Sequence, residues 1–435
     1  MDWKSEFKHK TVSAQEAIAS HVESGDGVFA GGLTVASSTI RALCEAVKAG
    51  TLAGIVMHGN LMLGDLTLAD PSFTEDRFRY RCFFAGPQER AGIKTGSVAY
   101  VPLQFGHYGR YLEHVRPAVA IVPMTPPDEN GYCNIGPMGF TPAALRNART
   151  VIAEIRPDLP RVCGSAHQYH VSEIAAFTLS DEPVAVLQSA PASAAETRIA
   201  EYIVDRVPDG ACIQLGIGGM ANAVGFGLRN KKHLGVHSEM FTESMAVLQA
   251  EGIIDNSRKF SMPGRSVVGF ALGTAEQYKY LTDNPDVYFV PFEDVIDINN
   301  IRANDNMISI NTALAIDLTG QICAESIGHQ QYSGTGGQVD FIRGANLSKG
   351  GMSFIAVSSV AATKQGPKSR FVLDLAPGSV VTTPRTEVQH VVTEYGCVNL
   401  QYCDIPTRAR RLISIAHPDF RDELAFQAKK AGYLY

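Results

Sequence analysis

The sequence predicts an α/β fold made of two similar α/β domains with largely parallel sheets. Short apolar runs, such as residues 118–122 and 353–357, alternate with segments of helical periodicity. One order of elements (helix, Asp-Gly turn, strand, glycine loop, helix) occurs twice, with a segment of small residues between the two occurrences. These observations together predict an internal duplication of an α/β unit.

The first occurrence begins at a capping box, Ser13-Ala14-Gln15-Glu16, which predicts a helix that continues to Val22. Gly25-Asp26-Gly27 ends that helix, and a short buried strand is expected from Val28. Gly31 and Gly32 then form a loop, after which residues 37–47 are expected to be helical.

The second occurrence repeats this plan, so that Asp209 corresponds to Asp26. Its predicted elements are a helix over 196–207, a turn over 208–210, a strand over 211–215, a glycine loop over 216–219 and a helix over 222–228. The segment SAPASAAE, residues 189–196, is typical of a linker or an exposed crossover. The sequence therefore predicts one domain over residues 1–191 and a second over residues 192–435.

Charge and composition restrict the partners. The formal net charge is −6, from 38 Lys and Arg against 44 Asp and Glu, which argues against a nucleic acid or an anionic membrane as partner. The charged first ten residues lack the apolar core of a signal peptide, and no uncharged apolar window of about 18 residues predicts a membrane span. Eight scattered cysteines without a C-x-x-C motif predict free thiols, so we expect a cytoplasmic protein.

No metal site is expected from the twelve histidines. None of them falls in an H-E-x-x-H motif. His233 and His237 are four residues apart on a predicted strand, where that spacing separates them widely. His167 and His170 have no carboxylate or cysteine beside them in the sequence.

The stretch GIGGMANAV, residues 216–224, leaves two interpretations open. It fits the dinucleotide fingerprint G-x-G-x-x-A, and Glu239 stands near the place of a ribose-binding acid. The same loop could serve any phosphate-bearing ligand, and Glu239 could equally be a catalytic carboxylate at the carboxyl end of a strand. A second glycine cluster, residues 333–345, suggests that backbone approaches a ligand closely there.

Five motifs in order resolve this choice by resemblance. They are QLGIGGMANAV, LGVHSEMFTES, NDNMISINTALAIDLTGQ, YSGTGGQVDFIRGA and VTEYGCVNL. Together they closely resemble the acetyl-CoA hydrolase/transferase family, the class I CoA-transferases, over nearly the whole chain. The resemblance implies two similar α/β domains with the active site in the cleft between them.

The resemblance also implies roles for particular residues. The catalytic glutamate of the family's G-x-[HY]-[ST]-E-M pattern falls on Glu239. Residues expected to bind CoA or to donate backbone N–H groups to an oxyanion are Gly216, Ile217, Gly218, Gly219, Met220, Gly334, Gly336 and Gly337. Coenzyme A is then a substrate, and no cofactor is expected. His237 is expected to be structural, whereas Ser238 could orient Glu239.

This sequence departs from the family pattern at two places near the site. Thr242-Glu243-Ser244 stands where the family often has Ser-Asp-Gly, and Ile296-Asp297-Ile298 replaces an Asn-Asp-Pro whose asparagine lines the family's active site. The first-domain loop GGLTVASSTI is also smaller and less charged than in hydroxybutyrate or acetate enzymes. The acid that accepts CoA therefore cannot be copied from a relative.

The expected chemistry is transfer of CoA from an acyl-CoA to a short-chain carboxylic acid. Glu239 would attack the thioester and later carry CoA as a glutamyl-CoA thioester. With an ordinary pKa of about 4.3, Glu239 would be ionised at neutral pH and need no general base. Two alternatives are an acyl-CoA hydrolase that admits water and an NAD-linked oxidoreductase. A homodimer or homotetramer is expected.

Overall fold

A computed structural model describes residues 2–64, 66, 68, 70, 72–188, 191–216 and 218–435. Its contacts divide the chain into two compact units. Unit 1 comprises Met1–Leu187 and Val268–Asp294, and unit 2 comprises Gln188–Val267 and Val295–Tyr435. The predicted domain boundary at residues 191 and 192 is a single cut, whereas this division also assigns Val268–Asp294 to the first unit.

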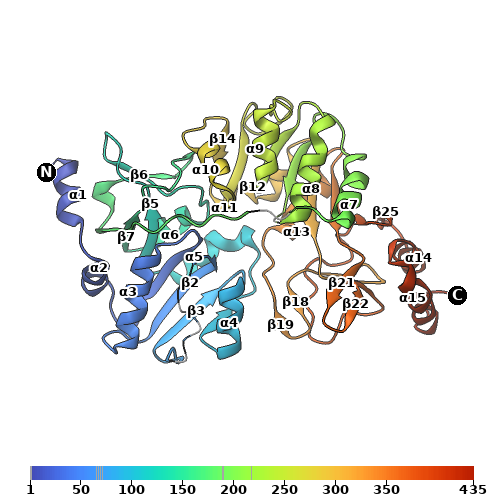
Figure 1. Ribbon diagram of the computed structural model, residues 1–435, viewed down its shortest axis with the longest axis horizontal. Coiled ribbons are helices and arrows are strands. Elements are labelled where there is room, and N and C mark those ends of the chain that lie inside the picture. Colours follow the sequence, from blue (N-terminus) through green and yellow to red (C-terminus); the bar gives the residue numbers. More distant parts are fainter. Residues whose placement is uncertain are drawn as a thin grey trace. The chain divides into compact units, whose positions relative to one another are not determined.

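Unit 1 is built around a seven-stranded sheet with the order β10-β7-β5-β1-β2-β3-β4, in which every described pair of neighbours is parallel (Figure 1). These strands are β1 (Gly27–Leu33), β2 (Ile55–Met62), β3 (Phe78–Cys82), β4 (Val98–Tyr100), β5 (Val119–Met124), β7 (Thr150–Ile155) and β10 (Ala176–Leu179). The helices are α1 (Trp3–Lys10), α2 (Ala14–His21), α3 (Ser37–Lys48), α4 (Pro87–Thr95), α5 (Tyr108–Val115), α6 (Thr141–Asn147), α10 (Ala275–Leu281) and α11 (Phe292–Val295), which ends at the first residue of unit 2.

Short strands complete unit 1. β6 (Tyr132–Asn134) pairs with β9 (Gln168–His170) in antiparallel fashion, and β8 (Cys163–Gly164) pairs with β14 (Val287–Phe289) in parallel. The strand β13 (Ser266–Ala271) begins in unit 2 and ends in unit 1. Two 3-10 turns cover Phe105–His107 and Val171–Glu173.

The sheet of unit 2 has the strand order β12-β11-β15-β20-β24-β25. Its members are β11 (Cys212–Leu215), β12 (Gly235–Phe241), β15 (Met307–Thr312), β20 (Met352–Ala356), β24 (His390–Thr393) and β25 (Gly396–Asn399), and only the β24–β25 pair is antiparallel. The helices of this unit are α7 (Ala194–Val204), α8 (Gly219–Gly227), α9 (Glu243–Ala250), α12 (Ile298–Arg302), α13 (Gln338–Leu347), α14 (Ile405–Ile415) and α15 (Pro418–Lys430).

Small ribbons lie beside the sheet of unit 2. They are formed by β16 (Ala315–Asp317), β17 (Ile322–Cys323), β18 (Ser326–Ile327), β19 (Gln330–Gln331), β21 (Val360–Thr363), β22 (Gly366–Ser369) and β23 (Phe371–Val372), and a 3-10 turn covers Leu228–Asn230. A buried apolar cluster that includes Ile342, Val391 and Leu412 packs α13, β24 and α14 together.

The two units share one topology. In unit 1 the strands run β10-β7-β5-β1-β2, and in unit 2 the corresponding order is β24-β20-β15-β11-β12. The first helices agree even in their caps, because Ser13 with Glu16 caps α2 and Ser193 with Glu196 caps α7 in the same reciprocal box. The prediction of two similar α/β domains with largely parallel sheets is therefore confirmed.

Two helical starts differ from the sequence prediction. The helix α1, Trp3–Lys10, was not predicted, because its residues are charged and none of them is buried. The helix α7 begins at Ala194, inside the predicted linker 189–196, because Ser193 supplies its cap. Ser189 and Ala190 of that linker lie outside the described residues.

Candidate active site

Glu239 lies at the carboxyl end of a parallel strand. Strands β11 and β12 are in register through Cys212–Gly235 and Ile213–Val236, and this register carries Glu239 to the level of Gly216, just beyond the last residue of β11. Ligands of open α/β sheets bind at this edge. The position of Glu239 therefore fits a functional carboxylate better than a structural one.

The second glycine cluster holds the carboxylate of Glu239. The backbone N–H of Gly337, at the cap position of α13, donates a hydrogen bond to it. A Cβ atom added to Gly337 would overlap Oε2 of Glu239, so only glycine allows this approach. Gly336 has a φ of 60°, a left-handed conformation that favours glycine at the turn before the helix.

Burial changes the charge state of Glu239. Burial raises its pKa to about 8, the negative charge of Asp340 adds to this effect, and the hydrogen bond from Gly337 opposes it. The side chain still keeps part of its surface open to solvent. The expectation of an ordinary pKa is therefore corrected, because the surrounding protein atoms desolvate the carboxylate. The raised pKa favours the protonated form in the free protein.

A buried carboxylate, Glu325, is hydrogen-bonded to two residues of the segment that contains Gly334. Glu325 accepts hydrogen bonds from Thr335 Oγ1 at 3.3 Å and from Gln331 Nε2 at 3.3 Å. Both donors flank Gly334, which is buried like Gly336 and Gly337. These bonds fix the loop that leads to Gly337, whose backbone N–H binds Glu239.

The first glycine loop leads from β11 into α8. The N–H of Gly216 donates to the carbonyl of Ile310 at 3.1 Å, so the sheet already uses it. Gly218 has a φ of 99°, and space is open around it. Gly219 and Met220 form the first turn of α8, where the Met220 side chain is buried. Ile217 lies outside the described residues.

A polar cluster at the same edge was missed by the sequence prediction. Gln214 Oε1 accepts hydrogen bonds from Ser309 Oγ at 2.7 Å and from Asn311 Nδ2 at 3.4 Å. All three side chains are buried near the carboxyl ends of β11 and β15. The signal in the sequence was a single amide, Gln214, in an otherwise apolar strand directly before the glycine loop.

The two residues before Glu239 bind backbone. His237 Nε2 donates to the carbonyl of Val295 at 2.8 Å, and burial, with a smaller effect of Lys259, lowers the pKa of His237 to about 4. The imidazole is therefore neutral and structural, as predicted. Ser238 Oγ donates to the carbonyl of Leu215 at 3.5 Å, a bond between neighbouring strands.

Both departures from the family pattern have structural roles. Thr242 caps α9 by accepting a hydrogen bond from the N–H of Met245 at 3.3 Å. Asp297 caps α12 through the N–H groups of Asn299 and Asn300, at 2.8 Å and 3.1 Å. Ile296 is 1% exposed and packs toward Gly337. An apolar side chain therefore lies near the place where Gly337 approaches the carboxylate.

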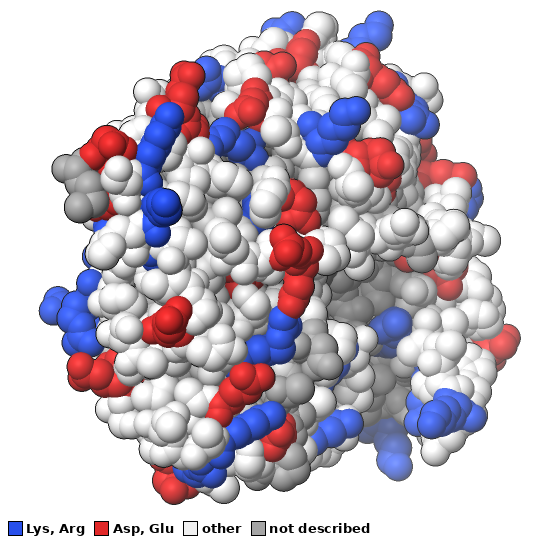
Figure 2. Space-filling model, turned by 60° about the vertical axis from the view of Figure 1, so that its left-hand side comes forward, with Lys and Arg blue, Asp and Glu red and all other residues white. Residues whose placement is uncertain are grey.

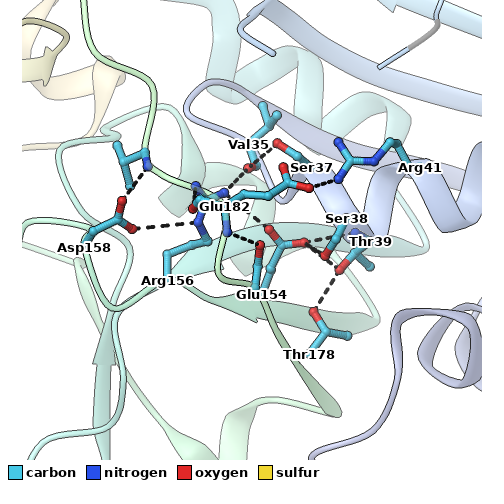
Figure 3. Close-up of polar contacts among 12 residues, drawn as sticks. Val35, Ser37, Ser38, Thr39, Arg41, Glu154, Arg156, Asp158, Thr178 and Glu182 are labelled. Atoms are coloured by element: carbon cyan, nitrogen blue, oxygen red, sulfur yellow. Dashed lines mark hydrogen bonds and ion pairs between the residues drawn. The ribbon is translucent and has the colours of Figure 1, made fainter. Parts of the chain in front are cut away.

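In unit 1, the loop after Gly31 and Gly32 corresponds to the glycine loop of unit 2. The helix α3 that follows it is hydrogen-bonded at its N-terminus to a buried carboxylate, Glu154 (Figure 3). Glu154 Oε2 accepts hydrogen bonds from Ser38 Oγ at 2.5 Å and from the Thr39 N–H at 2.9 Å, in the first turn of α3. Arg156 Nη1 contacts Glu154 Oε1 and the carbonyl of Val35, both at 3.4 Å. Glu154 thus occupies the Thr39 N–H in the first turn of α3, a donor of the kind that binds a phosphate at a helix N-terminus.

Further features of the described residues concern surface charge, cysteines, metal-binding groups and membrane-spanning helices. Lys, Arg, Asp and Glu are interspersed over the face drawn in Figure 2. All eight cysteines are free thiols. Within the described ranges, no group of three or more His, Cys, Asp or Glu side chains could hold a metal ion. None of the helices described has both the length and the apolar character that a bilayer crossing requires.

The fold and this edge define the class of protein, an α/β enzyme whose candidate site lies where parallel strands end at glycine loops. Family models then give the particular group. The acetyl-CoA hydrolase/transferase N-terminal domain matches residues 1–188, and the C-terminal domain of the same family matches residues 273–428. The chain belongs to the acetyl-CoA hydrolase/transferase family.

Individual relatives agree with this assignment. The succinyl-CoA:cyclohexane-1-carboxylate CoA transferase of Geobacter metallireducens is 39% identical over 438 residues, which cover 99% of this chain and 98% of the relative. The crystal structure of RipA from Yersinia pestis has a TM-score of 0.93 at 35% identity and covers 100% of both chains. An acetyl-CoA hydrolase of Candida albicans is 27% identical over 220 residues, 49% of this chain and 39% of the relative.

Proposed function

We propose that this protein is a CoA-transferase that moves CoA from an acyl-CoA to a short-chain carboxylic acid through a glutamyl-CoA thioester on Glu239. The observation that carries the proposal is the Glu239 carboxylate, bound by the Gly337 N–H at the carboxyl edge of the sheet. Full-length similarity to CoA-transferases supports it, whereas the similarity to hydrolases covers about half the chain. The glycine loop at 216–219 then serves CoA and not a dinucleotide.

The reaction begins at the thioester. A Glu239 oxygen attacks the acyl carbonyl, the C–S bond breaks, and CoA leaves as a thiolate, which produces an acyl-glutamyl anhydride. The thiolate attacks the glutamyl carbonyl, the anhydride C–O bond breaks, and the first acid leaves as a carboxylate. The acceptor carboxylate then displaces CoA from glutamyl-CoA, and the thiolate attacks the acceptor's acyl carbonyl and releases Glu239.

Gly337 has a defined task in this sequence. When the thiolate attacks the glutamyl carbonyl, negative charge develops on the Glu239 oxygens, one of which already accepts the Gly337 N–H. The donor is fixed at the start of α13 and needs no reorganisation during the reaction. The partial burial of the carboxylate removes water that would weaken its attack.

Gly337→Ala is therefore expected to lower kcat by about 10²- to 10³-fold, because the new methyl group displaces Glu239 from its donor. Steady-state kinetics with an acyl-CoA and a carboxylate acceptor measure this loss. Gly109→Ala is the matched control, since an added Cβ there, in α5, meets neighbours only at 3.5 Å or beyond. Equal activity of the two variants would remove Gly337 from the mechanism.

The pH dependence follows from the raised pKa of Glu239. Only the ionised carboxylate attacks, so kcat/KM is expected to rise with pH and to level off above about 8. Initial rates from about pH 5.5 to 9.5 test this, with acyl-CoA stability measured in parallel. A profile that stays flat down to pH 5.5 would mean that Glu239 keeps an ordinary pKa near 4.5.

Acceptor dependence tests the proposed function itself. Acetyl-CoA and succinyl-CoA are each incubated with a panel of short-chain acids, and mass spectrometry identifies the acyl-CoA formed while a thiol reagent measures free CoA. The proposal predicts a new acyl-CoA with little free thiol. Free CoA that accumulates at one rate with or without an acid would instead identify a hydrolase. A cytoplasmic location and a homodimer or homotetramer stay predictions.

A further inference from the structure

Three neighbours of the Glu239 carboxylate have different chemistry. The Gly337 N–H is a hydrogen-bond donor, Asp340 is a second carboxylate, and Ile296 is apolar. An added Cβ at Gly337 would lie 3.3 Å from Glu239 Cδ and 3.4 Å from Ile296 Cδ1. Glu239 and Ile296 thus both approach the position that a Gly337 side chain would take. The Ile296 side chain is 1% exposed and places an apolar methyl group near the point where Gly337 meets the carboxylate.

The residues before and after Ile296 in the chain both hold it in place. The preceding residue, Val295, accepts a hydrogen bond at its carbonyl from His237 Nε2 at 2.8 Å. This bond connects Val295 to β12, the strand that contains Glu239. Asp297, the following residue, caps α12. That helix packs against α13, the helix that begins with Gly337 as its cap.

The packing of these two helices is close. A Cβ atom at Gly344 of α13 would overlap the side chain of Ile301 in α12. Ile301 is fully buried, as is Val295. The position of Ile296 relative to Gly337 is therefore set by the core of unit 2. It does not depend on a surface loop.

The glutamyl-CoA thioester of the proposed function creates a need for such a group. The first acid must leave and the acceptor must enter before the thioester reacts again. During that interval a water oxygen could attack the glutamyl carbonyl, break the C–S bond, release CoA and return Glu239 as a carboxylate, with the water protons passing to the thiolate and solvent. The thioester energy would then be lost.

We infer that Ile296 is the residue that keeps water from the glutamyl carbonyl, so that it determines how the enzyme divides its intermediate between the acceptor acid and water. The inference rests on the proposed function. It assigns the choice between transferase and hydrolase to one apolar side chain. The role is one of selectivity, because Ile296 supplies no group to the bonds that change.

The test compares variants that differ in polarity at nearly constant volume. Ile296→Val and Ile296→Thr have side chains of similar size, but threonine presents a hydroxyl group that binds water. Ile296→Ala enlarges the space, and Ile298→Ala makes the same change two residues away, at the start of α12. Each protein is loaded with succinyl-CoA and freed of excess substrate. Intact mass then follows loss of the CoA adduct with and without acetate.

We expect the adduct of Ile296→Thr to be lost to water at least tenfold faster than that of Ile296→Val, with Ile296→Ala similarly fast. Ile298→Ala should behave like the native protein. If adducts form but all variants lose them to water at the native rate, the inference is wrong and the proposed function stands. If the native protein forms no adduct while turning over, the proposed function fails and the inference fails with it.

The result does not depend on full stability of each variant. The ratio of hydrolysis to transfer is measured only on molecules that have formed the adduct, so a partly unfolded fraction does not alter it. If Ile296→Ala does not fold, the Val and Thr variants still decide the question. Slow transfer without faster hydrolysis in Ile296→Thr would also contradict the inference, since it would indicate misplacement of Glu239 instead of entry of water.

Discussion

Replacing Glu239 with Gln is expected to lower the rate of CoA transfer by about 10⁴-fold or more, because an amide cannot form the anhydride or the thioester. The substitution keeps the size of the side chain, and its amide oxygen can still accept the Gly337 N–H. Substrate affinity should change far less than kcat. Steady-state rates and CoA binding by calorimetry separate the two effects.

A matched control and a stability measurement accompany this variant. Glu243→Gln makes the same change in the first turn of α9 and should retain nearly native activity. The stability of Glu239→Gln should equal or exceed that of the native protein at pH 8 and above. Because the pKa of Glu239 is raised, the native state holds a proton that the unfolded state has lost, so stability falls as pH rises from about 4.5 to about 8. A Gln variant with native turnover would remove Glu239 from catalysis.

The second prediction concerns stability. Breaking the buried ion pair between Arg156 and Glu154 in unit 1 is expected to destabilise the protein strongly. Arg156 is 1% exposed and Glu154 is fully buried at the end of β7, where Arg156 also binds the Val35 carbonyl before α3 and Glu154 binds the Thr39 N–H (Figure 3). Arg156→Met keeps much of the side-chain volume but leaves the Glu154 charge without its cation. A broken buried pair typically costs about 3–5 kcal/mol, and we expect a loss of this size in the free energy of unfolding.

A nearby exposed pair gives the matched control. Arg41 and Glu182 also form an ion pair, with side chains 34% and 44% exposed. Arg41→Met should cost less than about 1 kcal/mol, because water and salt screen exposed charges. Chemical denaturation followed by circular dichroism compares the two variants. If Arg156→Met were no less stable than Arg41→Met, the buried pair would not be what holds the loop.

Much of the fold could be predicted because local signals agreed with one another. A capping box, Asp-Gly turns and glycine loops marked the ends of elements, and the repetition of the turns and loops predicted two units of one topology. Glu239 could be singled out because it lies near the carboxyl end of a strand and falls in a family motif. The helix α1 was missed because its eight residues lack a buried face.

The electrostatics of the site could not be predicted in the same way. The raised pKa of Glu239 results from burial and from Asp340, which is distant in sequence. The loss of Gly216 as a donor depends on its pairing with Ile310 in another strand. The buried Arg156 could not be recognised either, because its partner atoms lie on three separate segments. Such contacts are tertiary and leave no local pattern.

The most direct test of the account is the intact mass of the protein after brief incubation with acetyl-CoA or succinyl-CoA, with Glu239→Ala in parallel. We expect a covalent adduct of the mass of CoA less water on the native protein only, and its discharge when a carboxylate is added. An adduct that persists in Glu239→Ala would place the nucleophile elsewhere. Turnover by the native protein without any adduct would contradict a glutamyl-CoA intermediate.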